Sequence, residues 1–366
     1  MPKVHHIQLD TDCEGPLALN DNAFELCRDF IKPQGDRFFQ QVSRYDDYLA
    51  GVAKKPGYKA GDTLKLILPF LKAQGLTNNR IEDYSRKTMR LVPGAVEAYK
   101  FLHRRKFPIF EISTSYRQFA EQVGLKLGFG RKRIFATELD LDRYRLSAAE
   151  AEELRGLQTE IIGAPEIDFS SEAHDPAELP GAVQEAIATL DRIFWERLPA
   201  MEIGALYQEV NPIGGPEKAK AVADSLTKTG LSLADTIYVG DSITDVEAFE
   251  AVRAGGGLAI SFNGNHYAVN AAEVVVVSDT AWSIALLAAI CQLWGKEGVL
   301  EVAAPETRAK SRSLVLPEEV IEPVMMGLTD RLFNLYLSKG PDRDHIAQES
   351  AAMRAQLRGE TVAALG

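Results

Sequence analysis

The chain has 366 residues with 46% hydrophobic and 25% charged side chains, an ordinary globular composition at a length that suits two domains of roughly 100–200 residues. Its 41 Lys and Arg against 52 Asp and Glu give a formal net charge of −11, which argues against a nucleic-acid or anionic-membrane surface. The three cysteines follow no metal or disulfide spacing, so we expect a reducing compartment and a cytoplasmic protein.

The first residues predict a short buried strand followed by a group of acids. Residues 4–11 form a β-like run that polar side chains interrupt too often for a signal peptide. Asp10, Asp12 and Glu14 lie at the C-terminal end of this run, next to a Gly-Pro turn. From residue 20 to 91 the pattern turns helical, with Pro and Gly breaks, which indicates a helical insert.

The next segments predict a helix and a buried strand, and then a second helical insert. A helix begins at Pro93, and the apolar residues 107–112 indicate a strand that ends at Ser113. Another helix and a short strand are expected within residues 118–136. Residues 147–205 are rich in Ala, Glu and Leu and are interpreted as a second insertion.

Strands continue to alternate with helices up to about residue 302. A helix that contains Lys218 precedes a strand that ends at Asp241, and two further strands are expected at 258–262 and 274–277. Such alternation implies a parallel sheet with right-handed crossovers and a site at the carboxyl ends of the strands.

An apolar stretch and a polar tail follow these strands. The apolar residues 281–294 fall short of the roughly 20 needed to cross a bilayer, so they are predicted to form a buried helix. From residue 303 onward the tail is expected to be helical and polar.

Four distant segments each place a polar group where a strand or a turn stops. They are the acids at 10–14, Ser113, Lys218 after a Gly-Gly-Pro turn, and the stretch Gly-Asp-Ser-Ile-Thr-Asp at 240–245. Gathered at one sheet edge they would supply a nucleophilic carboxylate, a hydroxyl, a cation and further carboxylates. A moving phosphoryl group carries negative charge, so it requires a divalent ion, a lysine and hydrogen-bond donors. Carboxylate oxygens suit Mg²⁺.

In this order the four segments resemble the four motifs of the haloacid dehalogenase superfamily of Asp-nucleophile phosphatases, in its phosphoserine-phosphatase-like branch. The resemblance implies an α/β fold with a three-layer, Rossmann-like parallel-sheet core and an inserted helical cap domain. The corresponding boundaries are 1–19, 92–146 and 206–302 for the catalytic core, 20–91 for the cap, 147–205 for a helical insertion and 303–366 for a helical C-terminal extension.

The first motif allows two registers, and we favour Asp12 as the nucleophile. Gly15-Pro-Leu17 then matches the Gly-x-Leu that follows in the superfamily. Glu14 stands where the family has its second Asp, and it would protonate the leaving alcohol and then activate water. Asp10 would lie behind the site and orient Lys218 or metal-bound water. In the other register Asp10 is the nucleophile and Asp12 the acid.

The resemblance implies that three side chains bind the phosphoryl group. Ser113 and Thr114 would donate to its oxygens, and Lys218 would neutralise its charge, with Lys220 as the weaker candidate for that lysine. Asp21, at the start of the cap, falls where the phosphoserine branch offers an acid to its substrate.

The same resemblance implies a Mg²⁺ ion as cofactor. Its ligands would be Asp12, the backbone carbonyl of Glu14, Asp241 and Asp245, the last of them directly or through water.

We therefore expect a phosphatase that hydrolyses a small phosphorylated metabolite through an aspartyl-phosphate, with no nucleic-acid or membrane partner and with homo-oligomerisation left open. A non-catalytic accessory or assembly protein of the same fold, and a phosphomutase, are the alternatives. Glu14 and Pro16 depart from the family pattern and keep the accessory alternative open. Residues 11–26 also resemble, more weakly, an archaeal branch associated with energy-converting hydrogenase.

Overall fold

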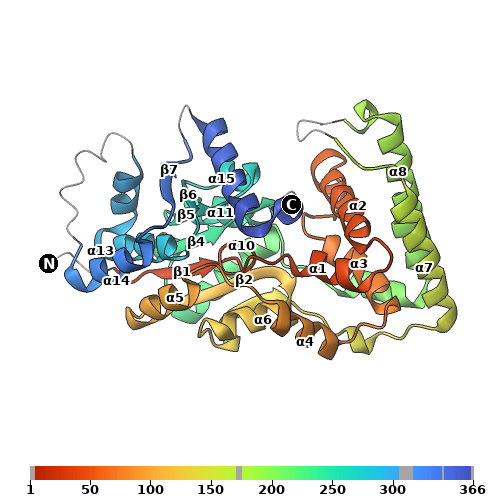
Figure 1. Cartoon of the computed structure of the whole chain (residues 1–366), viewed down its shortest axis with the longest axis horizontal. Coiled ribbons are helices and arrows are strands. Elements are labelled where there is room, and N and C mark those ends of the chain that lie inside the picture. Colours follow the sequence, from red (N-terminus) through yellow and green to blue (C-terminus); the bar gives the residue numbers. More distant parts are fainter. Residues whose placement is uncertain (1–4, 170–174, 305–315, 340–341, 364–366) are drawn as a thin grey trace.

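The computed structural model describes residues 5–169, 175–304, 316–339 and 342–363, which form a sheet lobe and a helical lobe side by side (Figure 1). The sheet has the strand order β3-β2-β1-β4-β5-β6-β7. Neighbouring strands are parallel except β6 and β7, which are antiparallel. The strands are β1 (Gln8–Thr11), β2 (Ile109–Tyr116), β3 (Ile134–Thr137), β4 (Thr236–Gly240), β5 (Leu258–Phe262), β6 (Val274–Ser278) and β7 (Phe333–Leu337).

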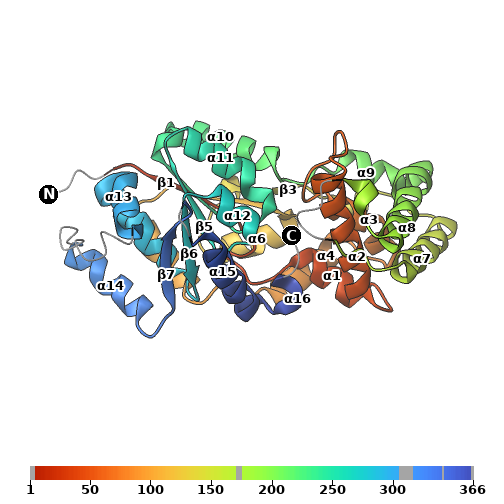
Figure 2. The same cartoon turned by 90° about the horizontal axis from the view of Figure 1, so that it is seen from above.

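Helices cover both faces of this sheet, so the sheet lobe has three layers (Figure 2). One layer holds α5 (Ala95–Arg104), α6 (Arg117–Lys126), α13 (Trp282–Ala303) and α14 (Glu318–Leu328). The other holds α10 (Pro216–Thr229), α11 (Val246–Ala254), α12 (His266–Ala271) and α15 (Arg343–Arg358). The short helix α16 (Glu360–Ala363) follows α15. The prediction of a mixed α/β fold with a mostly parallel sheet is confirmed.

The strands are buried on both faces because their side chains alternate between two apolar clusters. In β4, Ile237 and Val239 pack toward α13, whereas Tyr238 packs toward α10 and α11. In β1, Leu9 joins the α13 side, and Asp10 points to the opposite side, toward α10. Polar side chains on that opposite face therefore lie directly under α10.

The helical lobe is formed by two segments that are distant in the sequence. The first contributes α1 (Asn22–Phe30), α2 (Gly35–Asp47), η1 (Tyr48–Val52), α3 (Thr63–Ala73) and α4 (Asn78–Thr88). The second contributes α7 (Ala148–Gly163), α8 (Gly181–Asp191), η5 (Arg192–Arg197) and α9 (Ala205–Glu209). Side chains that begin some of these helices accept backbone N–H bonds, for example Asp21 from Phe24 and Ser147 from Glu150.

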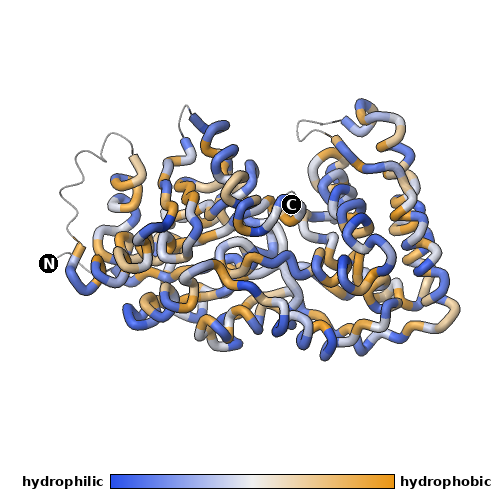
Figure 3. The backbone as a smooth tube through the Cα atoms, in the orientation of Figure 1, coloured by the Kyte–Doolittle hydropathy of each residue, from blue (hydrophilic) through white to orange (hydrophobic). Residues whose placement is uncertain are grey.

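One hydrophobic cluster joins these two segments. Phe38 and Phe70 of the first segment share it with Leu157 and Phe194 of the second, and Phe70 and Phe194 meet edge to face at 6.2 Å between ring centroids. In Figure 3 hydrophobic and hydrophilic stretches alternate along these helices, as expected for helices that bury one side. The two inserts predicted from the sequence thus pack as one body.

The tail differs from its predicted all-helical form, because β7 lies within it. The segment Phe-Asn-Leu-Tyr-Leu pairs antiparallel with β6 over five residue pairs and buries Leu335. Its alternating side chains fit a strand at the edge of a sheet, where one face is covered and the other is partly exposed. The part of the tail at residues 305–315 lies outside the described residues.

Two further expectations concern β2 and α13. The strand predicted to end at Ser113 continues to Tyr116, with a shift of register against β3 after Ser113. The apolar stretch predicted as a buried helix is α13, the one helix in the described ranges that is long and apolar enough to span a membrane. Of its most apolar window 67% is buried inside the protein, as in the core helix of a soluble protein.

Candidate active site

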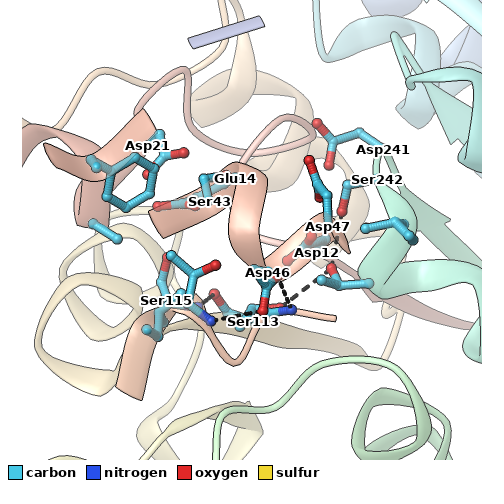
Figure 4. Close-up of a pocket in the computed structure, with 18 of the residues that line it drawn as sticks. Asp12, Glu14, Asp21, Ser43, Asp46, Asp47, Ser113, Ser115, Asp241 and Ser242 are labelled. Carbon is cyan, nitrogen blue, oxygen red and sulfur yellow. Dashed lines mark hydrogen bonds between the residues drawn. The ribbon is translucent and has the colours of Figure 1, made fainter. Parts of the chain in front are cut away.

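A cavity of about 110 Å³ lies where β1, β2 and β4 end, between the sheet lobe and the helical lobe. Residues from both lobes line it, and Figure 4 shows several of them pointing into the same space. Those of the sheet lobe and the C-terminal helix are Asp12, Glu14, Ser113, Thr114, Ser115, Asp241, Ser242, Ile243, Thr244, Arg354 and Arg358. Those of the helical lobe are Asp21, Ala23, Phe39, Ser43, Asp46, Asp47, Gly61, Thr63 and Leu64.

Lys218 joins two of the predicted site carboxylates. Its Nζ donates to Asp12 Oδ2 at 2.6 Å and to Asp245 Oδ1 at 2.7 Å, and its side chain is fully buried. Burial alone would lower the pKa of Lys218, yet the two carboxylates raise it above its usual value, so the amine stays charged. Lys220 is exposed on the same helix, so Lys218 is the lysine that the structure brings to the site.

Asp12 points into the cavity at the end of β1. Its Oδ1 accepts a hydrogen bond from the Cys13 backbone N–H at 2.7 Å, and its Oδ2 faces Lys218. Burial raises the pKa of Asp12 to about 7, and the cation of Lys218 opposes that rise.

Asp245 is held on both carboxylate oxygens. Its Oδ1 accepts from Lys218 and from the Tyr238 hydroxyl at 2.7 Å, and its Oδ2 accepts from the backbone N–H groups of Asp241 and Ser242 at 2.9 and 3.0 Å. These bonds fix the lysine and the turn that carries Asp241. Asp245 therefore positions its neighbours, and Asp12 and Asp241 retain the more accessible oxygens of the cluster.

Asp241 meets two arginines from the C-terminal helix α15, a contact that the sequence did not predict. Arg354 and Arg358 both donate to Asp241 Oδ2, and Arg358 Nη1 lies 3.1 Å from it. All three side chains are buried. The Asp241 carboxylate is thus paired inside the protein with two cations rather than with solvent.

The loop after β1 approaches Asp241 closely because Gly15 has no side chain. Its φ of +98° lies in the left-handed region, and a Cβ there would come 2.2 Å from Asp241 Oδ2. The glycine of the first motif is therefore required for the loop and Asp241 to meet.

Glu14 and Asp21 lie side by side at the start of the helical lobe. Glu14 Oε1 accepts from the Asn22 backbone N–H at 2.8 Å, and Asp21 Oδ1 accepts from the Phe24 N–H at 2.9 Å. Burial raises the pKa of Glu14 to about 8, the Asp21 carboxylate raises it as well, and Arg358 opposes both. At neutral pH Glu14 therefore carries a proton that it can donate.

Ser113 and its neighbours form the third wall of the cavity. The Ser113 hydroxyl oxygen accepts from the Ser115 backbone N–H at 3.1 Å, which leaves the hydroxyl hydrogen for a group in the cavity. Thr114 Oγ1 lies 3.4 Å from Thr244 Oγ1 and also lines the cavity. Ser115 was not predicted, although it follows Ser113 in the same short polar run.

Asp10 lies outside the cavity, under α10. Its carboxylate meets Gln8 Nε2 at 2.8 Å and the Ser225 hydroxyl at 2.7 Å. Gln8 in turn meets Thr229 at 2.8 Å. These contacts fix the helix that carries Lys218, so Asp10 acts on the lysine through α10.

The helical lobe supplies cavity residues that no sequence signal marked. Asp46 of α2 accepts from the backbone N–H groups of Gly61 and Thr63 at 3.2 and 3.1 Å, and burial raises its pKa to about 7. Among the contacts that join this lobe to the sheet lobe, Lys59 Nζ lies 2.7 Å from Asn211 Oδ1, and the Tyr116 hydroxyl donates to the Leu64 carbonyl at 2.6 Å.

The three buried carboxylates Asp12, Asp241 and Asp245 could hold a metal ion. One oxygen from each lies within 4.8 Å of the others. An all-oxygen donor set suits a hard divalent cation. The donor chemistry therefore fits a hard divalent cation.

Fold and site together define an α/β protein with a buried carboxylate and lysine site where its parallel strands end. The solved structure of gene product AF1437 from Archaeoglobus fulgidus matches 98% of this chain and 99% of its own chain, with a TM-score of 0.78 and 32% sequence identity. The chain belongs to the same family as that archaeal gene product. No protein-family model and no curated protein matches it.

Proposed function

We propose that the protein is a magnesium-dependent phosphatase of the haloacid dehalogenase type that hydrolyses a small phosphate monoester. The observation that carries the proposal is the Lys218 Nζ, which contacts both Asp12 and Asp245, with Asp241 and Ser113 lining the same cavity. A nucleophilic carboxylate, a fixed cation, a hydroxyl donor and a metal-competent carboxylate thus meet where phosphoryl transfer needs them.

In the first half of the reaction an Asp12 oxygen attacks phosphorus, and the bond from phosphorus to the leaving oxygen breaks. Glu14 gives its proton to that oxygen, which its raised pKa of about 8 supports at neutral pH. Lys218 holds the Asp12 carboxylate in place and offsets the charge of the aspartyl-phosphate. Ser113 donates its hydroxyl hydrogen to a phosphoryl oxygen.

In the second half, the Glu14 carboxylate takes a proton from water, whose oxygen attacks phosphorus and releases Asp12. The net reaction consumes one ester and one water and yields an alcohol and inorganic phosphate. A magnesium ion held by Asp12 and Asp241 would supply positive charge to the phosphoryl oxygens.

We take the helical lobe as the cap of this enzyme. It contributes Ser43, Asp46 and Thr63 to the cavity, so closure over the substrate would exclude water and select by size. The volume of about 110 Å³ is below the roughly 300–1,000 Å³ of drug-sized ligand pockets, which favours a small metabolite. The cytoplasmic location stays a prediction.

The proposal is tested by hydrolysis of p-nitrophenyl phosphate with Mg²⁺. We expect Asp12→Asn to lower kcat on the order of 10⁴-fold or more, because it removes the nucleophile. Asp10→Asn is the matched control two residues away, and it should retain activity. Loss in Asp10→Asn with activity kept in Asp12→Asn would overturn the assignment.

The non-catalytic accessory protein is the second candidate, and the two arginines on Asp241 favour it, because they place a fixed cation on a metal-competent oxygen. Absence of turnover by the wild type across a panel of phosphorylated metabolites would support this candidate.

A further inference from the structure

The helical lobe presents one face of α2 to the cavity. Asp46 and Asp47 follow Ser43 by three and four residues, so the three side chains leave the helix on the same side. All three line the cavity (Figure 4). Ser43 and Asp46 are buried, and Asp47 is partly exposed. This helix face is therefore one wall of the space whose other wall carries Asp12 and Ser113.

Two hydroxyl groups of the helical lobe have no hydrogen-bond partner within the part of the chain that the structure describes. They belong to Ser43 and Thr63, which are 7% and 5% exposed and which both line the cavity. A buried hydroxyl ordinarily has a partner. A polar ligand group that reaches this wall would supply one.

The two carboxylates of the α2 face are engaged to different degrees. Asp46 accepts from the Tyr58 hydroxyl and from the Gly61 backbone N–H, so it holds the loop before α3. Asp47 lies 3.6 Å from Arg44 Nη1, which is longer than a hydrogen bond. Burial raises the pKa of Asp47 to about 6, against the opposing charge of Arg44, so this carboxylate is mostly ionised at neutral pH. Asp47 is thus the carboxylate of this face that can accept from a ligand.

Negative charge is in excess around the cavity. Seven carboxylates line the cavity or contact its lysine, and three cations face them. The carboxylates are those of Asp12, Glu14, Asp21, Asp46, Asp47, Asp241 and Asp245, and the cations are Lys218, Arg354 and Arg358. A divalent ion would reduce this excess, and a phosphoryl group, with about −1.5 to −2 charges at neutral pH, would restore it. A positive charge on the rest of the substrate is therefore favoured, and a further negative charge is not.

Among the described residues, the helical lobe brings no lysine or arginine to the wall of the cavity. Its Lys59 and Lys65 pair with Asp62, which does not line the cavity. The two arginines that line it come from α15, and both contact Asp241. A substrate carboxylate at the α2 face would therefore meet Asp47 rather than a cation of the cavity wall.

We propose that Ser43 and Asp47 form a subsite for an ammonium group, and that the substrate is a short aminoalkyl phosphate. The ammonium donates to the Asp47 carboxylate and to the Ser43 hydroxyl oxygen, and the phosphoryl group lies at Asp12 and Ser113. The cavity volume of about 110 Å³ limits the chain between the two groups to a few atoms. The inference rests on the proposed phosphatase for the position of the phosphoryl group, but it does not require that hydrolysis follows.

Calorimetric titration with phosphonates, which have no ester bond to hydrolyse, tests the subsite in the presence of Mg²⁺. The chain ends in an ammonium in 3-aminopropylphosphonate, in a methyl group in butylphosphonate and in a carboxylate in 4-phosphonobutyrate. We expect the wild type to bind the amine about tenfold more tightly than butylphosphonate, because hydrogen bonds to charged groups are the stronger ones, and to bind the carboxylate most weakly. Asp47→Asn should reduce the tenfold preference to about twofold or less, and Ser43→Ala should reduce it in part.

Asp36→Asn is the matched control, since Asp36 is an exposed acid in the first turn of the same helix. It should keep the preference of the wild type. Equal affinity of the wild type for the amine and for butylphosphonate would overturn the subsite, and so would an undiminished preference in Asp47→Asn or the absence of binding of either compound. A preference that Asp47→Asn loses, without hydrolysis of 2-aminoethyl phosphate by the wild type, would count against the phosphatase and leave the subsite intact.

Discussion

Asp10 lies in β1 and Asp12 directly follows this strand, and the two residues differ in what covers them. Asp12 reaches the cavity and Lys218, whereas Asp10 remains under α10 beside Ser225. The Ser225 hydroxyl oxygen lies 2.7 Å from both Asp10 Oδ2 and the Val222 carbonyl. One hydroxyl hydrogen serves only one of them. If it is given to Val222, a protonated Asp10 can donate to Ser225, and every group in the network is satisfied.

We predict that Asp10 makes the stability of the protein depend on pH. Burial raises the pKa of Asp10 to about 7, above its ordinary value of 3.8. Between these two values the folded protein holds a proton that the unfolded chain has lost, so the contribution of Asp10 falls as pH rises through this window and levels off above it. The free energy of unfolding of Asp10→Asn, relative to that of the wild type, should therefore rise by about 1–3 kcal/mol from pH 5 to pH 8.

Urea unfolding of Asp10→Asn and the wild type at both pH values measures this gain. A difference in unfolding free energy that stays constant between pH 5 and pH 8 would show that Asp10 is ionised in the folded state.

At the scale of single residues, the sequence predicted the groups that follow a strand end and missed those that arrive by long-range packing. Asp12, Ser113 and Asp241 could be predicted because the carboxyl ends of parallel strands share one edge. Asp46 and Arg354 could not, because their helices carry ordinary amphipathic patterns. The four-residue spacing of Arg354 and Arg358 was the one local signal for the arginine pair.

The helix α15 is the element that completes the cavity. Its inner side packs Ile346 and Met353 against Val269, Val275 and Val277 of α12 and β6. One residue further along the helix is Arg354, so the packing of Met353 sets where that guanidinium lies. Val362, just beyond α15, belongs to the hydrophobic cluster of the helical lobe. The C-terminal segment thus contacts both lobes.

We predict that Met353→Ala destabilises the protein, because it leaves a cavity between α15 and the sheet. The expected loss in free energy of unfolding is about 2–5 kcal/mol. Guanidinium unfolding, followed by circular dichroism, measures it.

Met326→Ala is the matched control, since Met326 on α14 is 74% exposed. Its effect should stay within about 0.5 kcal/mol. A loss in Met353→Ala as small as that in Met326→Ala would mean that the packing of α15 contributes little to stability.

At this scale the sequence predicted most elements of the sheet but not β7. Five residues give too short a pattern to separate a strand from a helix. The segment becomes a strand because it pairs with β6. The sequence of the tail alone does not indicate this pairing.

Across the whole molecule, stability rests on separate hydrophobic clusters in the two lobes. The cluster of the helical lobe draws side chains from residues before β2 and after β3, so the sheet strands must be in place for its two halves to meet. Neither half can bury its apolar side without the other.

We predict that replacing residues 147–205 by a short Gly-Ser linker exposes the apolar sides of α2 and α3. Leu66, Phe70 and Leu71, all fully buried, lie in the cluster that the deletion opens. The variant should bind the dye ANS strongly or aggregate, because a large exposed apolar patch is not tolerated in water. A soluble variant with an unchanged Tm would contradict this account of the helical lobe.

The two arginines that pair with Asp241 are synthesised long after the rest of the site. Arg354 and Arg358 follow Asp241 by 113 and 117 residues, which a ribosome adds in about ten seconds. Until then, Lys218 is the cation that pairs with the carboxylates of Asp12 and Asp245, and Asp241 lacks its two arginines. Polypeptides released early by a stalled ribosome would keep that imbalance.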